Sequence, residues 1–311
     1  MSVRWCCAGR LSTAKTPRLF CSSSAWAGMT SVVSRTTVSC CDVPYLEERA
    51  DLMETLELVH DGAVAIVRIN RPPVNAVNRQ MMIELQECFG VLGEDRTINA
   101  VVVSAAGSRA FSAGIDIKER VAGEDRHRSA VDLLDYGRYW RETQGVVRHC
   151  PVPVIAAVDG PAIGAGFGLV GVCDLIVASE RASFVLSEID IGLLGGSSKA
   201  MRMLGPYKAR MMFLAGQPLD AHDLYRLGAV ERVVPAGDAE SSAVELGRLF
   251  AAKSPIALRL AKESMLRIEG MPVEDGYRVE QDYTTRLGGF NDSKEAMRAW
   301  LEKRPPVWTW S

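Results

Sequence analysis

Two segments of small residues offer backbone groups suited to stabilising negative charge. The first spans residues 111–119 (FSAGIDIKE) and the second spans residues 159–168 (DGPAIGAGFG). In each, small residues stand where a strand is expected to turn into the start of a helix. That geometry leaves backbone N–H groups without partners, and the helix dipole adds positive potential behind them. Two such N–H groups that converge on one point form an oxyanion hole, which stabilises negative charge developing on a carbonyl oxygen.

A carboxylate in an apolar setting is the candidate for proton transfer. Glu188 lies in sequence among Val185, Leu186, Ile189 and Leu193. Partial burial among such side chains raises the pKa of a carboxyl group toward values useful to a general acid or base. We expect Glu188 to be this group, and the alternative is a surface glutamate in a loop.

The elements around these residues alternate between strand and helix as far as residue 195. Short apolar runs predict strands at 56–59, 64–69, 100–104, 152–158, 175–178 and 183–185, with helices at 81–92 and 130–150. Beyond residue 195 the pattern is almost entirely helical, with segments at 198–204, 206–215, 220–226, 238–252, 255–268, 273–286 and 292–303. This order predicts an α/β fold with a parallel sheet. We expect a leader at 1–52, a catalytic core at 53–195 and a helical region at 196–311.

Composition excludes several classes of function. The 311 residues are 48% hydrophobic and 24% charged, which is typical of a globular protein, and the net charge of -2 predicts neither a nucleic acid partner nor an anionic membrane. No apolar run approaches the roughly 18 residues that span a bilayer. The four histidines are scattered, so we expect no metal site. Cys88, Cys150 and Cys173 lie among apolar residues and are predicted to be buried thiols in a reducing compartment.

The first 41 residues differ in composition from the rest of the chain. They contain five basic residues, no acidic ones and many serines and threonines, which is typical of an organellar transit peptide. The competing interpretation is an over-long start, with the initiator at Met29 or Met53. Arginine greatly outnumbers lysine, which favours a bacterial origin. We therefore expect a cytoplasmic protein, with the mitochondrial matrix as the alternative if residues 1–41 are a transit peptide.

Several motifs together resemble the enoyl-CoA hydratase/isomerase (crotonase) family over roughly residues 54–305. Besides the two small-residue loops, the resemblance is carried by 70–76 (NRPPVNA), 173–174 (CD), 187–193 (SEIDIGL) and 214–221 (LAGQPLDA). It implies a spiral core of ββα units with a helical C-terminal trimerisation region, and a homotrimer or homohexamer. It also implies an acyl-CoA thioester substrate, with CoA as part of that substrate and no other cofactor.

The resemblance also assigns roles to particular residues. Matched loop for loop, the backbone N–H groups of Ile115 and Ala165 are the oxyanion donors, and Glu188 is the catalytic acid/base. Asp116 is expected to hold its loop rather than to perform chemistry. The resemblance implies a substrate-binding set, partly through backbone contacts with CoA, that consists of Asn75, Ala76, Ala113, Gly114, Asp116, Gly164 and Gly168.

One position departs from the pattern of the family's hydratases. Those enzymes use two glutamates, and Gly168 stands where the first is expected, so the chain resembles single-glutamate members. Both the Δ3,Δ2-enoyl-CoA isomerases and the hydroxycinnamoyl-CoA hydratase-lyases fit that pattern. Double-bond isomerisation and hydration by one carboxylate therefore both stay open, with thioester hydrolysis or decarboxylation behind them. A catalytically impaired acyl-CoA-binding protein is the alternative from another class.

Other branches of the family are less compatible with the chain. The dienoyl-CoA isomerases need an additional aspartate where this chain has Gly196, and the dehalogenases need a nucleophilic aspartate in the same region. Three aromatic residues, Tyr136, Tyr139 and Trp140, lie where family members vary the acyl pocket. At helical spacing they could also be core residues.

Overall fold

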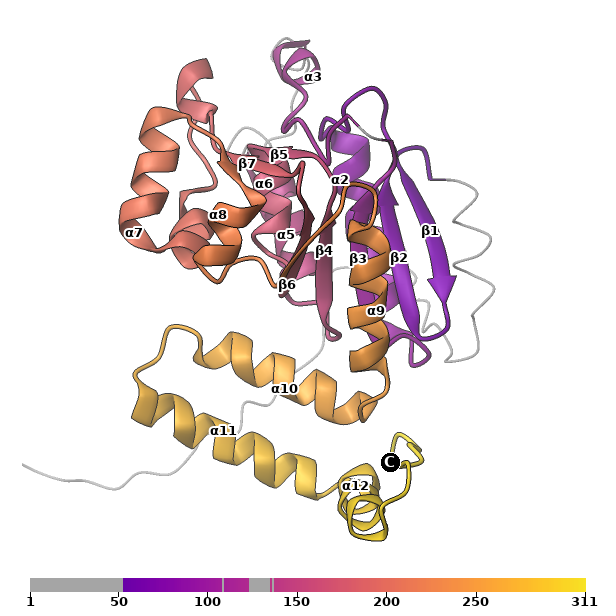
Figure 1. Cartoon of the computed structure of the whole chain (residues 1–311). Helices are drawn as coiled ribbons and strands as arrows, with labels where there is room; N and C mark the ends of the chain where they lie inside the picture. Colours follow the sequence, from indigo (N-terminus) through magenta and orange to yellow (C-terminus); the bar gives the residue numbers. More distant parts are fainter. Residues whose placement is uncertain (1–52, 108, 123–134, 136) are drawn as a thin grey trace, which may run out of the picture. The chain divides into compact units, whose positions relative to one another are not determined.

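The computed structural model describes residues 53–107, 109–122, 135 and 137–311, and its elements are labelled in Figure 1. The predicted leader, residues 1–52, lies outside the described residues, as do His127, Tyr136 and most of the expected helical stretch before residue 137. From Met53 onward the described residues belong to one compact unit. None of their helices has the length and apolar character needed to cross a membrane.

A six-stranded sheet forms the centre of this unit, in the order β1-β2-β3-β4-β6-β9. Its strands are β1 (Leu56–Asp61), β2 (Val64–Ile69), β3 (Ala100–Ala105), β4 (Val154–Val158), β6 (Leu175–Ser179) and β9 (Arg232–Val234). β1 and β2 form an antiparallel hairpin, and every later pairing is parallel. β3 and β4 are buried along almost their whole length, as the apolar runs predict for parallel strands covered on both faces.

Helices cover both faces of the sheet. α2 (Arg79–Glu94), α5 (Arg138–Arg148) and α6 (Ala165–Val170) belong to the core cluster on one face, and α9 (Ala239–Ala251) belongs to the cluster on the other. The other helices are α3 (Ile117–Ala122), α7 (Ser197–Ala215), α8 (Ala221–Arg226), α10 (Pro255–Ile268), α11 (Val273–Gly288) and α12 (Asn291–Glu302). Alternate residues of β3 point to opposite faces, so Val101 and Val103 join the core with α2, whereas Val102 joins a second cluster with α9 (Figure 1). The fold is α/β with C-terminal helices, as the sequence predicts.

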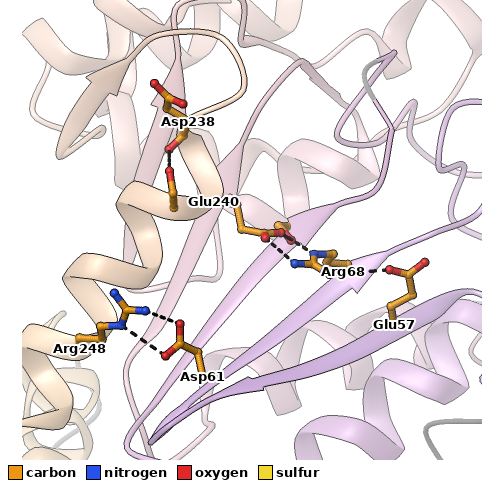
Figure 2. Close-up of polar contacts among 8 residues, drawn as sticks. Glu57, Asp61, Arg68, Asp238, Glu240 and Arg248 are labelled. Atoms are coloured by element: carbon orange, nitrogen blue, oxygen red, sulfur yellow. Dashed lines mark hydrogen bonds and ion pairs between the residues drawn. The ribbon is translucent and has the colours of Figure 1, made fainter.

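Ion pairs fix α9 across the sheet, as Figure 2 shows. Arg68 of β2 donates two hydrogen bonds of 2.7 Å to the Glu240 carboxylate of α9, and Ser104 of β3 donates another of 2.6 Å. The hydrogen bond from Arg68 lowers the pKa of Glu240, so the carboxylate stays ionised. Farther along α9, Arg248 pairs with Asp61 at the end of β1. These contacts attach a C-terminal helix to the N-terminal hairpin.

The region after residue 195, predicted to be almost entirely helical, also contains the short strands β8 and β9. β8 (Leu219–Asp220) begins just before α8, and β9 pairs with β6 in the central sheet. β9 is the last strand of the central sheet, and α9 packs on one face of that sheet. Part of the predicted helical region is therefore built into the core. The expected break between 198–204 and 206–215 is present, since Gly205 leaves helical geometry at φ 71° and ψ 167° inside α7.

A smaller sheet positions the loops of interest. Its three strands lie in the order β5-β7-β8, where β5 is Pro161–Ile163 and β7 is Ser183–Val185. β5 and β7 are parallel, with Ile163 opposite Val185, and the N–H of Gly164 donates to the carbonyl of Val185 at 2.9 Å. A short 3₁₀ helix, Glu188–Ile191, follows β7. The pairing therefore places Glu188 close to the segment that leads into α6.

Candidate active site

The two small-residue loops lie in direct backbone contact. Ser112 and Ala162 form an isolated parallel bridge, in which the N–H of Ser112 donates to Pro161 and the N–H of Ile163 donates to Ser112. The donor–acceptor distances are 3.2 and 2.9 Å. On its other side the first loop bridges to Val77, whose N–H donates to the carbonyl of Gly114 at 2.7 Å. The first loop is therefore held between the segment before α2 and the second loop.

Glycine is required where these loops meet. Gly114 has φ +91°, and a Cβ placed on it would lie 3.0 Å from the carbonyl oxygen of Ile163 and 3.5 Å from the nitrogen of Ala165. A Cβ on Gly166 would lie 2.7 Å from the carbonyl oxygen of Ser112. Side chains at either position would push the loops apart, so the close approach depends on their absence.

The contact leaves two N–H groups unpaired. Bonds along the first loop use the N–H groups on either side of Ile115, and no described residue accepts from Ile115 itself. Ala165 is the first residue of α6, where the helix supplies no acceptor, and nothing in the described part of the chain accepts from it. Because the nitrogen of Ala165 lies against Gly114, the two predicted oxyanion donors are brought to neighbouring positions.

Glu188 lies beside the second of these donors. Its Oε1 is 3.2 Å from the position that a Cβ on Gly164 would take, and Gly164 immediately precedes Ala165. The side chain is half-buried, and its buried Oε2 has no hydrogen-bond partner among the described residues. Burial raises the pKa of this carboxyl, and a hydrogen bond from its own backbone N–H offsets only part of the effect. The surroundings thus favour a carboxyl group that can both accept and return a proton.

The predicted CoA-contacting residues lie in the segment before α2 and in the first loop. Asn75 is buried in a left-handed conformation, and its side chain bonds Arg71, Ala106 and Ala110. Those bonds occupy its amide, so a ligand would meet this segment through the backbone. The N–H of Ala113 donates to the carbonyl of Val74 at 2.9 Å, which joins the segment to the first loop.

Asp116 has the contacts of a loop-holding residue. Its carboxylate accepts hydrogen bonds from the N–H groups of Lys118 and Glu119 and pairs with Arg71 at 2.7 Å, while Arg71 also donates to the carbonyl of Ala76. Burial opposes ionisation, but the Glu119 N–H and the Arg71 guanidinium outweigh it and lower the pKa of Asp116. A carboxylate kept ionised and fully engaged is poorly suited to proton transfer.

Gly168 lies one turn along α6 from Gly164, and its N–H donates to the Gly164 carbonyl at 2.9 Å. A Cβ on Gly168 would lie 2.9 Å from the side-chain nitrogen of Gln144 and 3.6 Å from Cζ2 of Trp140. Side chains of α5, Gln144 and Trp140, therefore lie where the side chain of the expected first glutamate would begin. Gln144 was not among the predicted site residues, although a glutamine four positions after Trp140 on one helix face was a signal for it.

The two described aromatic candidates, Tyr139 and Trp140, both pack against the core. Trp140 reaches Gly168 and also packs against the core, whereas Tyr139 lies under the guanidinium of Arg79 at 4.2 Å. Gly196 has φ +75°, and a Cβ on it would lie 2.4 Å from Leu186. An aspartate at that position would be strained and crowded, which agrees with the departure from the dienoyl-CoA isomerases.

The three cysteines after residue 53 are buried, as predicted. Burial raises the pKa of the Cys88 thiol to about 12 and also raises the pKa of Cys150 and Cys173. They therefore stay protonated and are poor nucleophiles. Among the residues that the structure describes, no three His, Cys, Asp or Glu side chains gather in the manner of a metal site.

Solved structures define the class of fold. A crystal structure of an enoyl-CoA hydratase from Bacillus anthracis matches with a TM-score of 0.76 and 29% sequence identity, over 82% of this chain and 99% of that one. The chain thus has the crotonase-type fold, with its two loops meeting at the start of α6.

Sequence comparison then defines the family. The family model described as enoyl-CoA hydratase/isomerase matches residues 60–310. A hydrolase of Mycobacterium tuberculosis, named "(7aS)-7a-methyl-1,5-dioxo-2,3,5,6,7,7a-hexahydro-1H-indene-carboxyl-CoA hydrolase", is 35% identical over 78% of this chain and 96% of its own length. Carnitinyl-CoA dehydratase of Salmonella enteritidis is 32% identical over 83% of this chain and 99% of its own. The chain belongs to the enoyl-CoA hydratase/isomerase family and is an acyl-CoA-processing enzyme.

The contact between the loops yields a prediction for Gly114. A Gly114→Ala substitution should lower kcat/KM by about 100-fold, because the new Cβ would move the first loop away from Ala165 and separate the two N–H donors. Gly107→Ala is the matched control, since Gly107 also has a positive φ, +79°, but a Cβ there would meet nothing within 4 Å. Steady-state kinetics and thermal melting of both variants make the test. Equal losses of activity in the two would contradict a specific role for the loop contact.

Proposed function

We propose that this protein acts on the double bond of an enoyl-CoA thioester, with Glu188 as its single proton shuttle. The N–H groups of Ile115 and Ala165 bind the thioester oxygen and stabilise the enolate. The observation that carries the proposal is the position of a half-buried carboxyl with a raised pKa beside two loops whose adjoining N–H groups are unpaired. Asn75, Ala76, Ala113, Gly114 and Gly164 form the channel for the CoA-bearing part of the substrate.

The chemistry follows from having one carboxylate. In isomerisation, Glu188 removes a proton from the carbon next to the thioester carbonyl, the hole holds the resulting enolate, and Glu188 returns the proton farther along the chain. In hydration, Glu188 takes a proton from water that adds to the double bond and delivers it to the neighbouring carbon. We place hydration first, because a nearly buried amide, Gln144, lies where the expected first glutamate would begin.

Thioester hydrolysis is the second candidate. It is favoured by the name of the Mycobacterium tuberculosis relative, a hydrolase of a bicyclic carboxyl-CoA, whereas the Salmonella relative is named as a dehydratase. The same two N–H groups would hold the negatively charged thioester oxygen in each reaction, as an enolate in hydration or dehydration and as a tetrahedral intermediate in thioester hydrolysis. The proposed chemistry uses CoA as part of the substrate and no further cofactor. We place the enzyme in the cytoplasm, with the mitochondrial matrix as the alternative.

We further propose a homotrimer or homohexamer assembled through α7 and the segment before it. Tyr207, Met211 and Leu214 lie three or four residues apart on one face of α7 and are 85%, 56% and 67% exposed. Leu194, just before α7, is 84% exposed. Exposed apolar side chains gathered in this way are typical of a surface that is buried in an assembly.

The reaction is tested with isotopically labelled water. The full-length protein is given 2-enoyl-, 3-enoyl- and aryl-2-enoyl-CoA in heavy-oxygen water and in deuterium oxide, and the products are analysed by mass spectrometry. We expect heavy oxygen in the acyl product, and a Glu188→Gln variant should lose at least about 100-fold in kcat because an amide does not accept and release a proton as a carboxyl group does.

A Glu180→Gln variant serves as the control for this measurement, since Glu180 is an exposed glutamate in the turn after β6. A shifted double bond without oxygen uptake would support the isomerase instead. Release of free CoA would support thioester hydrolysis. Full activity of Glu188→Gln would refute the assigned role of Glu188.

The raised pKa of Glu188 also predicts how stability depends on pH. Below its ordinary pKa of 4.5 the carboxyl is neutral in both folded and unfolded chains and contributes nothing. As pH rises above 4.5 the unfolded chain ionises first, so the folded state loses relative stability until the raised pKa is passed. Glu188→Gln should therefore melt about 2 °C above the wild type at pH 8 and at the same temperature at pH 4. Glu180→Gln should show no such pH-dependent gap, and a gap that narrows with rising pH would contradict the assignment.

The assembly is tested by native mass measurement. The wild type should have three or six times the chain mass of 33.9 kDa. A Tyr207→Glu/Leu214→Glu double variant should dissociate, because it places charge on the apolar face of α7. Leu249→Glu changes an exposed leucine on α9 and should leave the mass unchanged. A monomeric wild type would disprove the proposed assembly.

A further inference from the structure

Gln144 is an almost fully buried polar residue whose side chain has no hydrogen-bond partner among the described residues. It is only 8% exposed, and its nitrogen lies 2.9 Å from the Cβ position of Gly168. Its neighbour on α5, Thr143, turns to the other side, donates to the carbonyls of Met82 and Tyr139, and accepts from Gln86. α5 thus fixes itself to α2 through Thr143 and presents Gln144 to α6.

A second donor lies beside this amide. Nε1 of Trp140 is 4.0 Å from the same Cβ position, and no described residue accepts a hydrogen bond from it. Trp140 and Gln144 are four residues apart, so they are neighbours on one face of α5. An indole N–H can only donate and an amide can donate or accept, so the pair suits an oxygen atom as ligand. Trp140 is only partly buried, and neither polar group is among the buried atoms without a partner, so a polar ligand can reach both of them.

The position of the pair relates it to Glu188 and the oxyanion donors. Gly164, which caps the N-terminus of α6, and Gly168 are one turn apart, and the Glu188 carboxylate and the Gln144 amide each approach one of them. One turn of helix rises about 5.4 Å. In an acyl thioester, an oxygen on the third acyl carbon is separated from the thioester oxygen by a similar span. A thioester oxygen held near Ala165 would thus place the third carbon's oxygen near Gly168.

We propose that Gln144 and Trp140 bind the oxygen of the third acyl carbon, present as the water about to add or as the hydroxyl that it becomes. This inference rests on the proposed function and specifies its substrate as a 2-enoyl or 3-hydroxyacyl thioester. In the hydration step, Glu188 accepts a proton from the held water, and the water oxygen bonds to carbon 3. The π electron pair moves onto the thioester oxygen as an enolate, and the proton then passes from Glu188 to carbon 2. Gln144 holds the oxygen throughout and exchanges no proton.

The test compares two thioesters that differ by this one oxygen. Butyryl-CoA and 3-hydroxybutyryl-CoA are titrated calorimetrically into the full-length protein in a Glu188→Gln background, where turnover is blocked. With Gln144 present, we expect 3-hydroxybutyryl-CoA to bind about tenfold more tightly than butyryl-CoA. Gln144→Met keeps the length of the side chain and removes its polarity. It should abolish this difference and leave the affinity for butyryl-CoA unchanged.

A kinetic measurement separates positioning from a structural role. In the otherwise wild-type protein, Gln144→Met should lower kcat for hydration of 2-butenoyl-CoA by about tenfold or more and leave KM unchanged, because the lost contact is to water. Gln86→Met is the matched control, since Gln86 bonds Thr143 and Tyr139 and supports α5 without facing Gly168. It should lower the melting temperature and leave the preference for the hydroxylated thioester intact.

The outcomes distinguish this inference from the proposed function. A preference that survives in Gln144→Met, or an equal weakening of both thioesters, would overturn the assignment of Gln144 while leaving the acyl-CoA enzyme in place. Failure of the Gln144-containing protein to bind either thioester would overturn the proposed function and this inference with it.

Discussion

Close backbone contact between residues 112–115 and 161–166 is the constraint on which the site depends. The bridge between Ser112 and Ala162 uses some N–H groups of the two segments and leaves those of Ile115 and Ala165 unpaired. Backbone donors cannot rotate away as side chains can, so their orientation is fixed before any ligand arrives. Such preorganised dipoles stabilise a developing charge without a cost of reorganisation during the reaction. The bridge from Ile115 to Val77 and the pairing of β5 with β7 hold the two segments from either side.

The position of Glu188 combines a structural cost with chemical usefulness. The pairing of β5 with β7 fixes Val185, and Glu188 follows three residues later. Its carboxylate is half-buried, and one of its oxygens has no partner among the described residues. Burial disfavours the ionised form and raises the pKa, which lowers the stability of the fold at neutral pH. The same shift brings the carboxyl closer to the proton affinity that an acid/base needs at that pH. An ion pair such as that of Asp116 with Arg71 has the opposite effect, and it is found where loop geometry rather than proton transfer is at stake.

The sequence predicts the elements whose signal is local and does not reveal those that depend on distant partners. β3 and β4 are continuous apolar runs, so their burial could be read directly. β5, β8 and β9 are two or three residues long and carry no periodicity, because their pairing depends on strands far away in the chain. The oxyanion loops could be recognised from their glycines, since close backbone approach restricts residue type. The spacing of Trp140 and Gln144 marks a shared helix face, but the place of Gln144 in the site depends on how α5 packs against α6, which no local pattern encodes.

The glycines in α6 and at its two ends explain how the site is polar without a second carboxylate. Gly164 admits the Glu188 carboxylate, Gly168 admits the Gln144 amide, and a Cβ on Gly171 would lie 2.7 Å from the Cβ of Lys199. Neighbouring elements thus supply the chemistry along a helix face that has no side chains of its own. A glutamate at residue 168 would add a second negative charge near Glu188, and two such carboxylates raise each other's tendency to hold a proton. A neutral amide adds no charge, so burial remains the main influence on the pKa of Glu188, partly offset by the bond from its own N–H. A single group would then carry the proton through the whole reaction.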